Sequence, residues 1–352
     1  PPILKLTNNI VEFFVGAEGR LAAISVETDR PLGALPRPWE ALAQGGENLE
    51  TFLDDPAIQN RIRSVGTKYI RIDHVFDLLG VVGRNNSGQL TYDWTRLDNL
   101  VNKIQTVGAT PFISLSYMPS VMTASDEVGE PKNWNEWSAI VRAIIERYSA
   151  TRGIQDMYYE VWNEPDLFGK WKIGRGKDYL NLYKHAAIGA RQATGTRPFK
   201  LCGPATTGLY KNWMDKFFPY VLGNNLKFDC FTWHRYDLDV FKYSEDVDSV
   251  EAWIESHPYF AGVEKIVTEM GPNSEAGNEN NTKTGAAHLV AVMRELMGKV
   301  KYGFSFSVTG GWGIVDNQSP RYQALQLLSR LGNNRLGVFG DGSWVRAIGA
   351  QD

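Results

Sequence analysis

The sequence has very little cysteine, with only Cys202 and Cys230 among 352 residues. Each lies in a short apolar run typical of a strand, so we expect two buried, unreactive thiols rather than a disulfide or a metal pair. Histidine is also scarce, and the five residues are scattered without the spacing of metal ligands. The sequence therefore calls for no metal, and nothing in it calls for a cofactor.

An excess of charge of one sign and long hydrophobic runs are missing too. The net charge of -3 gives no electrostatic reason to expect nucleic acid or an anionic membrane as a partner. No apolar stretch is long enough to span a bilayer. No GxGxxG motif follows an early strand, which removes the main support for a dinucleotide-binding fold. Composition leaves the compartment and the oligomeric state open.

What is present is typical of a globular protein with a large core. Hydrophobic residues make up 43% and charged residues 22% of the chain. The 11 tryptophans and 15 tyrosines supply many flat apolar faces with polar edges. Such faces suit carbohydrate, although most aromatic side chains in proteins simply fill cores.

Strand-like and helix-like segments alternate along most of the chain. The expected strands are 20–28, 67–72, 110–116, 157–163, 200–203, 229–234, 265–269 and 302–307. The expected helices are 54–64, 94–107, 134–148, 178–194, 212–222, 247–256, 284–297 and 321–331. Eight strands, each followed by a helix or a segment of helix length, predict an α/β fold of the (β/α)8 TIM-barrel class; a doubly wound sheet fits less well.

Both ends of the chain carry additional strand signals. Residues 3–15 indicate one or two short strands, and residues 336–339 and 344–348, separated by a Gly-Asp-Gly turn, indicate a hairpin. We expect a catalytic barrel over residues 1–335 and this hairpin over 336–352. The hairpin either pairs with the N-terminal strands in a small β side sheet or begins a truncated β-sandwich.

The main candidate for a catalytic motif is the run Tyr159-Glu160-Val161-Trp162-Asn163-Glu164-Pro165. Pro165 has no N–H for a ladder and biases Glu164 toward an extended conformation, so the strand should end with this carboxylate at its tip. A carboxylate at the C-terminal end of a strand is where a barrel keeps its chemistry. A glutamate followed by a proline would by itself indicate an ordinary turn. The adjacent Trp162 and Asn163 favour a functional site, because an aromatic face and an amide together suit a sugar ring.

A second carboxylate, Glu269, ends another short apolar strand before Gly271 and Pro272. Glycoside hydrolysis commonly needs two carboxyl groups flanking one bond, one protonated and one ionised. In a barrel, Glu164 and Glu269 would close the fourth and seventh strands and so share one mouth. Sequence spacing therefore predicts a pair of catalytic glutamates.

Further polar side chains stand at the expected strand ends. Candidate substrate-binding residues are Arg71, His74, Asn163, His234, Tyr236 and Trp312. Each has an alternative explanation: Arg71 and Asp73 could form a plain barrel ion pair, and His234 could satisfy a backbone group. If the barrel brings all six residues to one mouth, a functional site explains the set better than these separate structural roles do. Arg71, if near Glu269, would keep that carboxylate ionised.

The Asn-Glu-Pro motif and the seventh-strand glutamate resemble the retaining (β/α)8 glycosidase clan. Within it, residues 159–167 resemble glycoside hydrolase family 39, which includes β-xylosidases, α-L-iduronidases and endo-acting exopolysaccharide hydrolases. The resemblance covers roughly Leu21 to Leu331. It implies that Glu164 is the general acid/base, that Glu269 is the nucleophile, and that Asn163 holds the hydroxyl beside the anomeric carbon. We assign Trp312 as the platform on which the sugar stacks.

The function expected from this resemblance is retaining hydrolysis of a glycosidic bond in an oligo- or polysaccharide. One alternative is a barrel enzyme acting on a phosphorylated metabolite, because residues 309–313 (Thr-Gly-Gly-Trp-Gly) follow strand eight, where barrels often hold phosphate. The other is a sugar-binding barrel without catalysis. The family resemblance alone favours an extracellular or periplasmic location.

Overall fold

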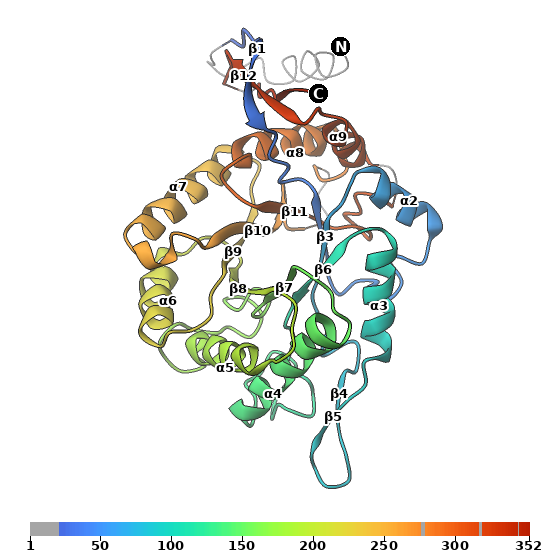
Figure 1. Ribbon diagram of the computed structural model, residues 1–352, viewed down its shortest axis with the longest axis vertical. Coiled ribbons are helices and arrows are strands. Elements are labelled where there is room, and N and C mark those ends of the chain that lie inside the picture. The colour runs from blue at the N-terminus through green and yellow to red at the C-terminus, as the bar shows by residue number, and fades with distance from the viewer. Residues whose placement is uncertain (1–20, 276–278, 317–318, 344) are drawn as a thin grey trace.

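A computed structural model describes residues 21–275, 279–316, 319–343 and 345–352. Its centre is a closed barrel of eight strands in which every neighbouring pair is parallel. Helices surround the barrel on the outside (Figure 1). The barrel strands are β2 (Ala41–Gln44), β3 (Tyr69–Ile72), β6 (Thr110–Ser114), β7 (Met157–Glu160), β8 (Phe199–Thr206), β9 (Cys230–Tyr236), β10 (Glu264–Gly271) and β11 (Tyr302–Phe306). The predicted (β/α)8 barrel is confirmed.

The first barrel strand differs from the prediction. The segment at 20–28 does not enter the barrel: strand β1 (Ser25–Ala34) is largely exposed and pairs outside it. The first barrel strand is instead β2, which is wholly buried and pairs with β3 and β11. A barrel strand is covered on both faces, and the charged β1 segment cannot be buried in that way. The numbering of strands four and seven is unaffected.

Except for α7, which begins six residues before the expected 247, the helices begin and end within a few residues of where they were expected. They are α2 (Pro56–Ser64), α3 (Thr95–Thr106), α4 (Trp134–Ile145), α5 (Tyr179–Gln192), α6 (Lys211–Gly223), α7 (Phe241–Glu255), α8 (Lys283–Leu296) and α9 (Pro320–Ser329), with short turns η1 (Glu146–Thr151) and η2 (Pro258–Phe260). Asp55 caps α2 by accepting from the Ala57 N–H, with Pro56 in the first turn. None of the described helices is long and apolar enough to cross a membrane.

Aromatic side chains fill the barrel interior. Its buried cluster includes Tyr69, Phe112, Tyr158, Tyr302 and Phe304, and the rings of Phe112 and Tyr158 stack at a centroid distance of 5.1 Å. Larger apolar contacts lie between the strands and the helices outside. The interior below the mouth is therefore solid, and the polar side chains at the strand ends rest on a rigid floor.

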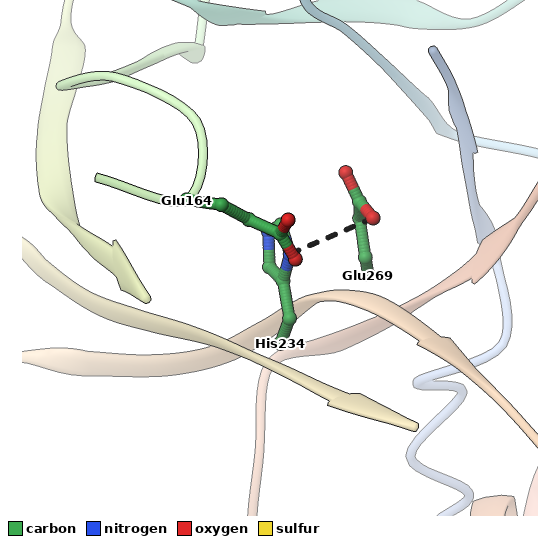
Figure 2. A group of neighbouring side chains, drawn as sticks. All are labelled: Glu164, His234 and Glu269. Carbon is green, nitrogen blue, oxygen red and sulfur yellow. Dashed lines mark hydrogen bonds and ion pairs between the residues drawn. The ribbon is translucent and has the colours of Figure 1, made fainter. Parts of the chain in front are cut away.

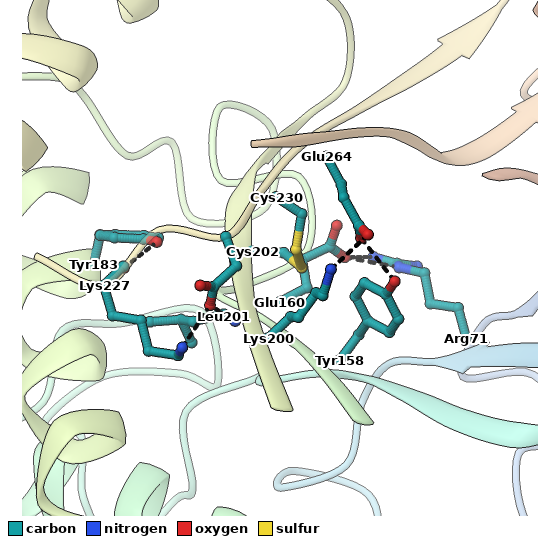
Figure 3. Close-up of a disulfide and its surroundings, with 11 residues drawn as sticks. Arg71, Tyr158, Glu160, Tyr183, Lys200, Leu201, Cys202, Lys227, Cys230 and Glu264 are labelled. Atoms are coloured by element: carbon teal, nitrogen blue, oxygen red, sulfur yellow. Dashed lines mark hydrogen bonds and ion pairs between the residues drawn. A yellow bond between two sulfur atoms is a disulfide. The ribbon is translucent and has the colours of Figure 1, made fainter. Parts of the chain in front are cut away.

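The prediction of two free thiols is wrong. Cys202 of β8 and Cys230 of β9 form a disulfide inside the barrel (Figure 3). The two residues are direct partners on adjacent parallel strands, with Cα atoms 4.6 Å apart. The chain separation of 28 residues carries no sign of this register, which only the closed barrel creates.

A small antiparallel sheet, in the order β1-β12-β13, lies beside the barrel near α8 and α9 (Figure 1). Strand β12 (Asn334–Phe339) pairs with both β1 and β13 (Gly349–Gln351), which confirms the predicted side sheet. The returning strand begins later than the expected 344–348. A hairpin of β4 (Val82–Arg84) and β5 (Leu90–Tyr92), not predicted, projects past α4. The expected strands in 3–15 and residue Trp344 lie outside the described residues.

Candidate active site

Four barrel strands bring these sequence-predicted residues to one mouth. Asn163 and Glu164 follow β7, Glu269 is near the end of β10, and Arg71 is in β3. His234 and Tyr236 both belong to β9. Because all barrel strands run parallel, these ends share one face of the barrel. The structure thus places both glutamates at the same end of the barrel.

The backbone at Glu164 differs from the extended form expected before Pro165. Strand β7 ends at Glu160, and Trp162 and Glu164 have φ angles of 76° and 45°. The Glu164 N–H donates to Ala205 O at 3.0 Å, while its carbonyl accepts from the Phe168 N–H at 2.7 Å. These contacts override the local bias of the proline. Backbone strain of this kind costs about 1–3 kcal/mol per residue and concentrates at functional sites.

The two glutamates face each other beside His234 (Figure 2). One oxygen of Glu164, one oxygen of Glu269 and a ring nitrogen of His234 all lie within 4.8 Å of one another. His234 Nδ1 is 2.8 Å from Glu164 Oε1 and 3.5 Å from Glu269 Oε2. Burial acts to lower the pKa of His234, but the carboxylates of Glu269 and Glu164 outweigh it and raise that pKa.

Glu269 is held by two donors. Arg71 Nη1 donates to its Oε1 at 2.8 Å, and the Tyr236 hydroxyl donates to its Oε2 at 2.8 Å. Its exposed fraction is only 6%. Burial, and next the negative charge of Glu269, raise the pKa of Tyr236, so the phenol remains a donor. A guanidinium and a phenol therefore donate to both oxygens of the Glu269 carboxylate and fix its position.

Arg71 also holds a carboxylate that the sequence analysis did not single out. Its Nε and Nη2 contact Glu160 Oε2 at 2.8 and 2.7 Å, and Nη2 donates to Asn163 Oδ1 at 2.7 Å. Arg71 and Glu160 are both fully buried, and Figure 3 shows them in the barrel near the disulfide. Glu160 lies two residues after the inward-facing Tyr158, so alternation along β7 was the signal that could have found it.

Asn163 is fixed from two sides. Its Oδ1 accepts from Arg71, and its Nδ2 donates to the Tyr117 hydroxyl at 2.8 Å. The same hydroxyl lies 3.3 Å from the Asn163 carbonyl. Tyr117 follows β6 and lies one residue beyond the strand expected at 110–116. The Tyr117 ring packs edge-on against Trp162, with a centroid distance of 5.1 Å. Tyr117 thus connects the Asn163 amide to the buried aromatic side chains next to it.

His74 and Trp312 border the mouth on its other sides. His74 Nδ1 is paired with Asp77 Oδ2 at 2.7 Å, and its ring packs against Tyr117 at 4.6 Å. Trp312 packs on Phe306, the last residue of β11, at 5.2 Å. Its indole Nε1 is buried and has no hydrogen-bond partner.

The loop after β11 does not offer a phosphate cradle. The Gly310 N–H donates to the Asp316 carboxylate at 2.8 Å, and the Thr309 N–H donates to Gln44 Oε1 at 3.0 Å. The Gly313 N–H donates to Gly310 O at 2.9 Å. Since these amides already have acceptors, one of them a carboxylate, the loop gives the phosphorylated-metabolite alternative no support.

Glu164, His234 and Glu269 are also close enough together to be considered as metal ligands. His234 Nδ1, however, is engaged with Glu164, and both Glu269 oxygens accept hydrogen bonds from Arg71 and Tyr236. Arg71 further brings a fixed positive charge to within 2.8 Å of the same carboxylate. The facing atoms of this set are thus already engaged with one another, with Arg71 and with Tyr236, which suits proton transfer and carboxylate chemistry better than a cation.

The chain is similar to known proteins in sequence and in fold. The family model described as "Glycosyl hydrolases family 39" matches residues 23–286. A curated β-xylosidase of Caldicellulosiruptor saccharolyticus is 24% identical, and the match covers 91% of this chain and 74% of that protein. A β-xylosidase of Geobacillus stearothermophilus is 27% identical over 157 residues, 41% of this chain and 31% of that one.

Solved structures show the same fold. A monomeric β-xylosidase from Caulobacter crescentus CB15 matches with a TM-score of 0.76 and 24% identity, covering 91% of this chain and 73% of that one. The GH39 enzyme from Xanthomonas axonopodis pv. citri matches with a TM-score of 0.77 and 22% identity, covering 92% and 73%.

Proposed function

Because the chain belongs to glycosyl hydrolase family 39 and is a glycoside hydrolase, we propose that Glu164 is its general acid/base and Glu269 its nucleophile. The observation that carries this proposal is the close approach of the two carboxylates, with oxygens within 4.8 Å. Retaining glycosidases have carboxyl groups about 5–5.5 Å apart, whereas inverting enzymes separate them by roughly 6.5–9.5 Å to admit a water.

The unequal surroundings of the two glutamates support this division of roles. Glu269 accepts from a guanidinium and a phenol, which hold its carboxylate in place as a nucleophile. Glu164 is held at one oxygen by His234, and none of the described side chains forms a hydrogen bond with its Oε2. That oxygen is available to the glycosidic oxygen of a substrate.

In the first step, a Glu269 oxygen attacks the anomeric carbon while Glu164 gives its proton to the departing glycosidic oxygen. The bond to the leaving group breaks, and a glycosyl ester of Glu269 forms. In the second step, Glu164 takes a proton from water, whose oxygen attacks the same carbon and releases Glu269. Asn163, oriented by Arg71 and Tyr117, would hold the hydroxyl beside the anomeric carbon.

Trp312 and Tyr236 belong to the surroundings of the bound sugar in this proposal. Trp312 packs on Phe306, and Tyr236 lies 6.4 Å from the same ring, so the three form one aromatic side of the mouth. Aromatic faces suit the C–H face of a sugar. Since both curated relatives are β-xylosidases, aryl β-xylosides are the first substrates to test.

Trapping and product analysis test the roles together. A 2-deoxy-2-fluoro glycoside with an activated leaving group should label Glu269, as read by peptide mass spectrometry, and Glu269→Gln should not be labelled. NMR of the first-formed product should show the anomer of the substrate. Label on another residue, or an inverted anomer, would refute the assignment. Binding without turnover of any glycoside would favour the non-catalytic alternative.

The disulfide supports an extracellular or periplasmic location. Disulfides persist in oxidising compartments and are rare in the cytosol of most organisms. Cys202 and Cys230 are both fully buried on adjacent strands, so their bond belongs to the folded barrel. Fractionation of producing cells would test this location, and activity confined to the cytosolic fraction would contradict it.

A further inference from the structure

A pocket of about 240 Å³ opens between the loop that joins β7 to α5 and the first turns of α6. Loops that follow barrel strands belong to the catalytic face, and α5 and α6 are neighbours around the barrel (Figure 1). Asp166, on the pocket wall, comes two residues after Glu164, so their Cα atoms lie within about 7 Å of each other. The pocket therefore begins beside the proposed acid/base.

The loop that forms one wall of the pocket is anchored at several points. The Trp171 N–H donates to Pro165 O at 2.8 Å, and the Gly174 N–H donates to Asp178 Oδ1 at 2.8 Å. Gly174 has a φ of 73°, a value that favours glycine, and a Cβ there would lie 3.4 Å from Lys216 Cδ. The wall is thus tied both to the residue after Glu164 and to α6.

The cations that line the pocket are Lys172, Arg175 and Lys216. Lys172 and Arg175 are exposed, and neither forms an ion pair with a described residue. Lys216 Nζ donates to a backbone carbonyl at 3.1 Å, which leaves its charge in place. Among the described lining residues, Asp166 is the one carboxylate, and Thr207 already donates to both of its oxygens. Three positive charges against one negative charge leave a surplus of two.

This surplus is a local feature, because the whole chain carries a net charge of -3. Arginine and lysine side chains form charge-assisted hydrogen bonds with the oxygens of an anionic group. Trp213 also lines the pocket, and aromatic side chains suit the C–H face of a sugar. The pocket thus combines the two kinds of group that an acidic sugar requires.

We infer that this pocket binds an acidic sugar unit, one that bears a carboxylate or a sulfate group, in the part of the substrate that departs. The inference rests on the proposed function, in which Glu164 gives its proton to the departing glycosidic oxygen. The loop that continues from Glu164 then flanks the leaving group. An acidic unit held in the pocket would lie in the leaving group, close to the bond that is cleaved.

Binding is measured without reliance on turnover, by affinity electrophoresis of the native protein in gels that contain a polysaccharide. Glucuronoxylan and dextran sulfate are the charged probes, and arabinoxylan and dextran are their uncharged counterparts. At least one charged probe should bind roughly 10-fold or more tightly than its counterpart. Preference for glucuronoxylan alone identifies a carboxylate, and preference for dextran sulfate alone identifies a sulfate. Equal binding within both pairs would overturn the inference.

A triple variant connects this preference to the pocket. Joint replacement Lys172→Gln, Arg175→Gln and Lys216→Gln should lower the affinity for the charged probe roughly 10-fold or more, as expected for three exposed charge contacts. All three side chains are exposed, so the core is untouched, and thermal melting checks the fold.

The matched control removes the same charge at the opposite end of the barrel. Lys68→Gln, Lys299→Gln and Lys301→Gln change residues that precede strands β3 and β11. This control should bind the charged probe as the native protein does. Equal loss of affinity in both triple variants would show a general effect of charge and overturn the assignment to the pocket.

Product analysis tests the position of the acidic unit. An oligosaccharide with a single acidic branch should release a reducing-end fragment that carries the branch. A branch found only on the other fragment would overturn the assignment to the departing side. Trapping at Glu269 decides the proposed function separately. Labelled Glu269 without a preference for charged probes would refute this inference alone, and charge-dependent binding without turnover of any glycoside would refute the catalytic roles.

Discussion

Replacing Glu164 by Gln isolates proton donation from substrate binding. The amide keeps an oxygen that can accept from His234, which is 2.8 Å away in the native site. Among the described residues, no Lys or Arg forms an ion pair with Glu164, so the change leaves no buried Lys or Arg unpaired. We therefore expect a melting temperature close to that of the native protein and a KM of similar size for substrates with slow chemistry.

The rate should fall according to the leaving group. General acid catalysis contributes roughly 10²–10⁴-fold, equivalent to about 2.7–5.4 kcal/mol of transition-state stabilisation. A glycoside with an alkyl or sugar leaving group needs the proton and should lose this whole factor. A dinitrophenyl glycoside needs almost no protonation, so its first step should be nearly unchanged. Hydrolysis of the intermediate also needs Glu164 as base, so this substrate should give a burst followed by slow turnover.

Stopped-flow release of dinitrophenol separates the two steps. We expect a burst of dinitrophenol equal in concentration to the enzyme, followed by slow steady-state release. The control is Asp166→Asn, two residues along the chain, whose carboxylate accepts from the Thr207 N–H at 3.0 Å. It should behave as the native enzyme. Equal losses on good and poor leaving groups, or absence of a burst, would refute the acid/base role of Glu164.

Other contacts lead to separate expectations. Tyr236→Phe removes a hydrogen bond to Glu269, so kcat/KM should fall roughly 10- to 100-fold with little change in melting temperature; an unchanged rate would argue against the contact. Burial raises the pKa of Asp73 to about 7 from 3.8. The folded chain therefore binds the proton of Asp73 more tightly than the unfolded chain does. The resulting contribution to the free energy of unfolding is complete below about pH 4 and is lost as the pH rises through about 7. In the Asp73→Asn protein, the melting temperature should depend less on pH over that range. Parallel curves of melting temperature against pH for the variant and the native protein would contradict this expectation. Joint replacement of Cys202 and Cys230 by Ala should cost about 3–4 kcal/mol of unfolding free energy, from the chain entropy of the closed loop; alkylation of two thiols in the native protein would show that the disulfide is absent.

Local sequence was sufficient for the barrel class and for both glutamates. The Asn-Glu-Pro motif and the Glu269 segment each combine a short apolar strand with an abrupt end, and such patterns depend only on neighbouring residues. Most helices were also found within a few residues, because amphipathic periodicity and caps such as Asp55 are local signals. The parallel barrel then follows from the alternation of the two element types.

Features that depend on register were decided by the tertiary structure. Strand β2 is four residues long, and two of them are Ala, so its sequence has weak strand propensity. It is a strand because β3 and β11 pair with it on either side. The Cys202–Cys230 bond likewise requires β8 and β9 to align these two residues.

The same reason explains the parts of the site that were missed. Glu160 was visible in the motif, but only the closed barrel turns it inward against Arg71. The expected extended form of Glu164 gave way to a positive φ because its backbone is held by hydrogen bonds with Ala205 of β8 and with Phe168, four residues further along the same loop. Local residues determined which side chains are candidates for the chemistry, and long-range pairing determined which partners surround them.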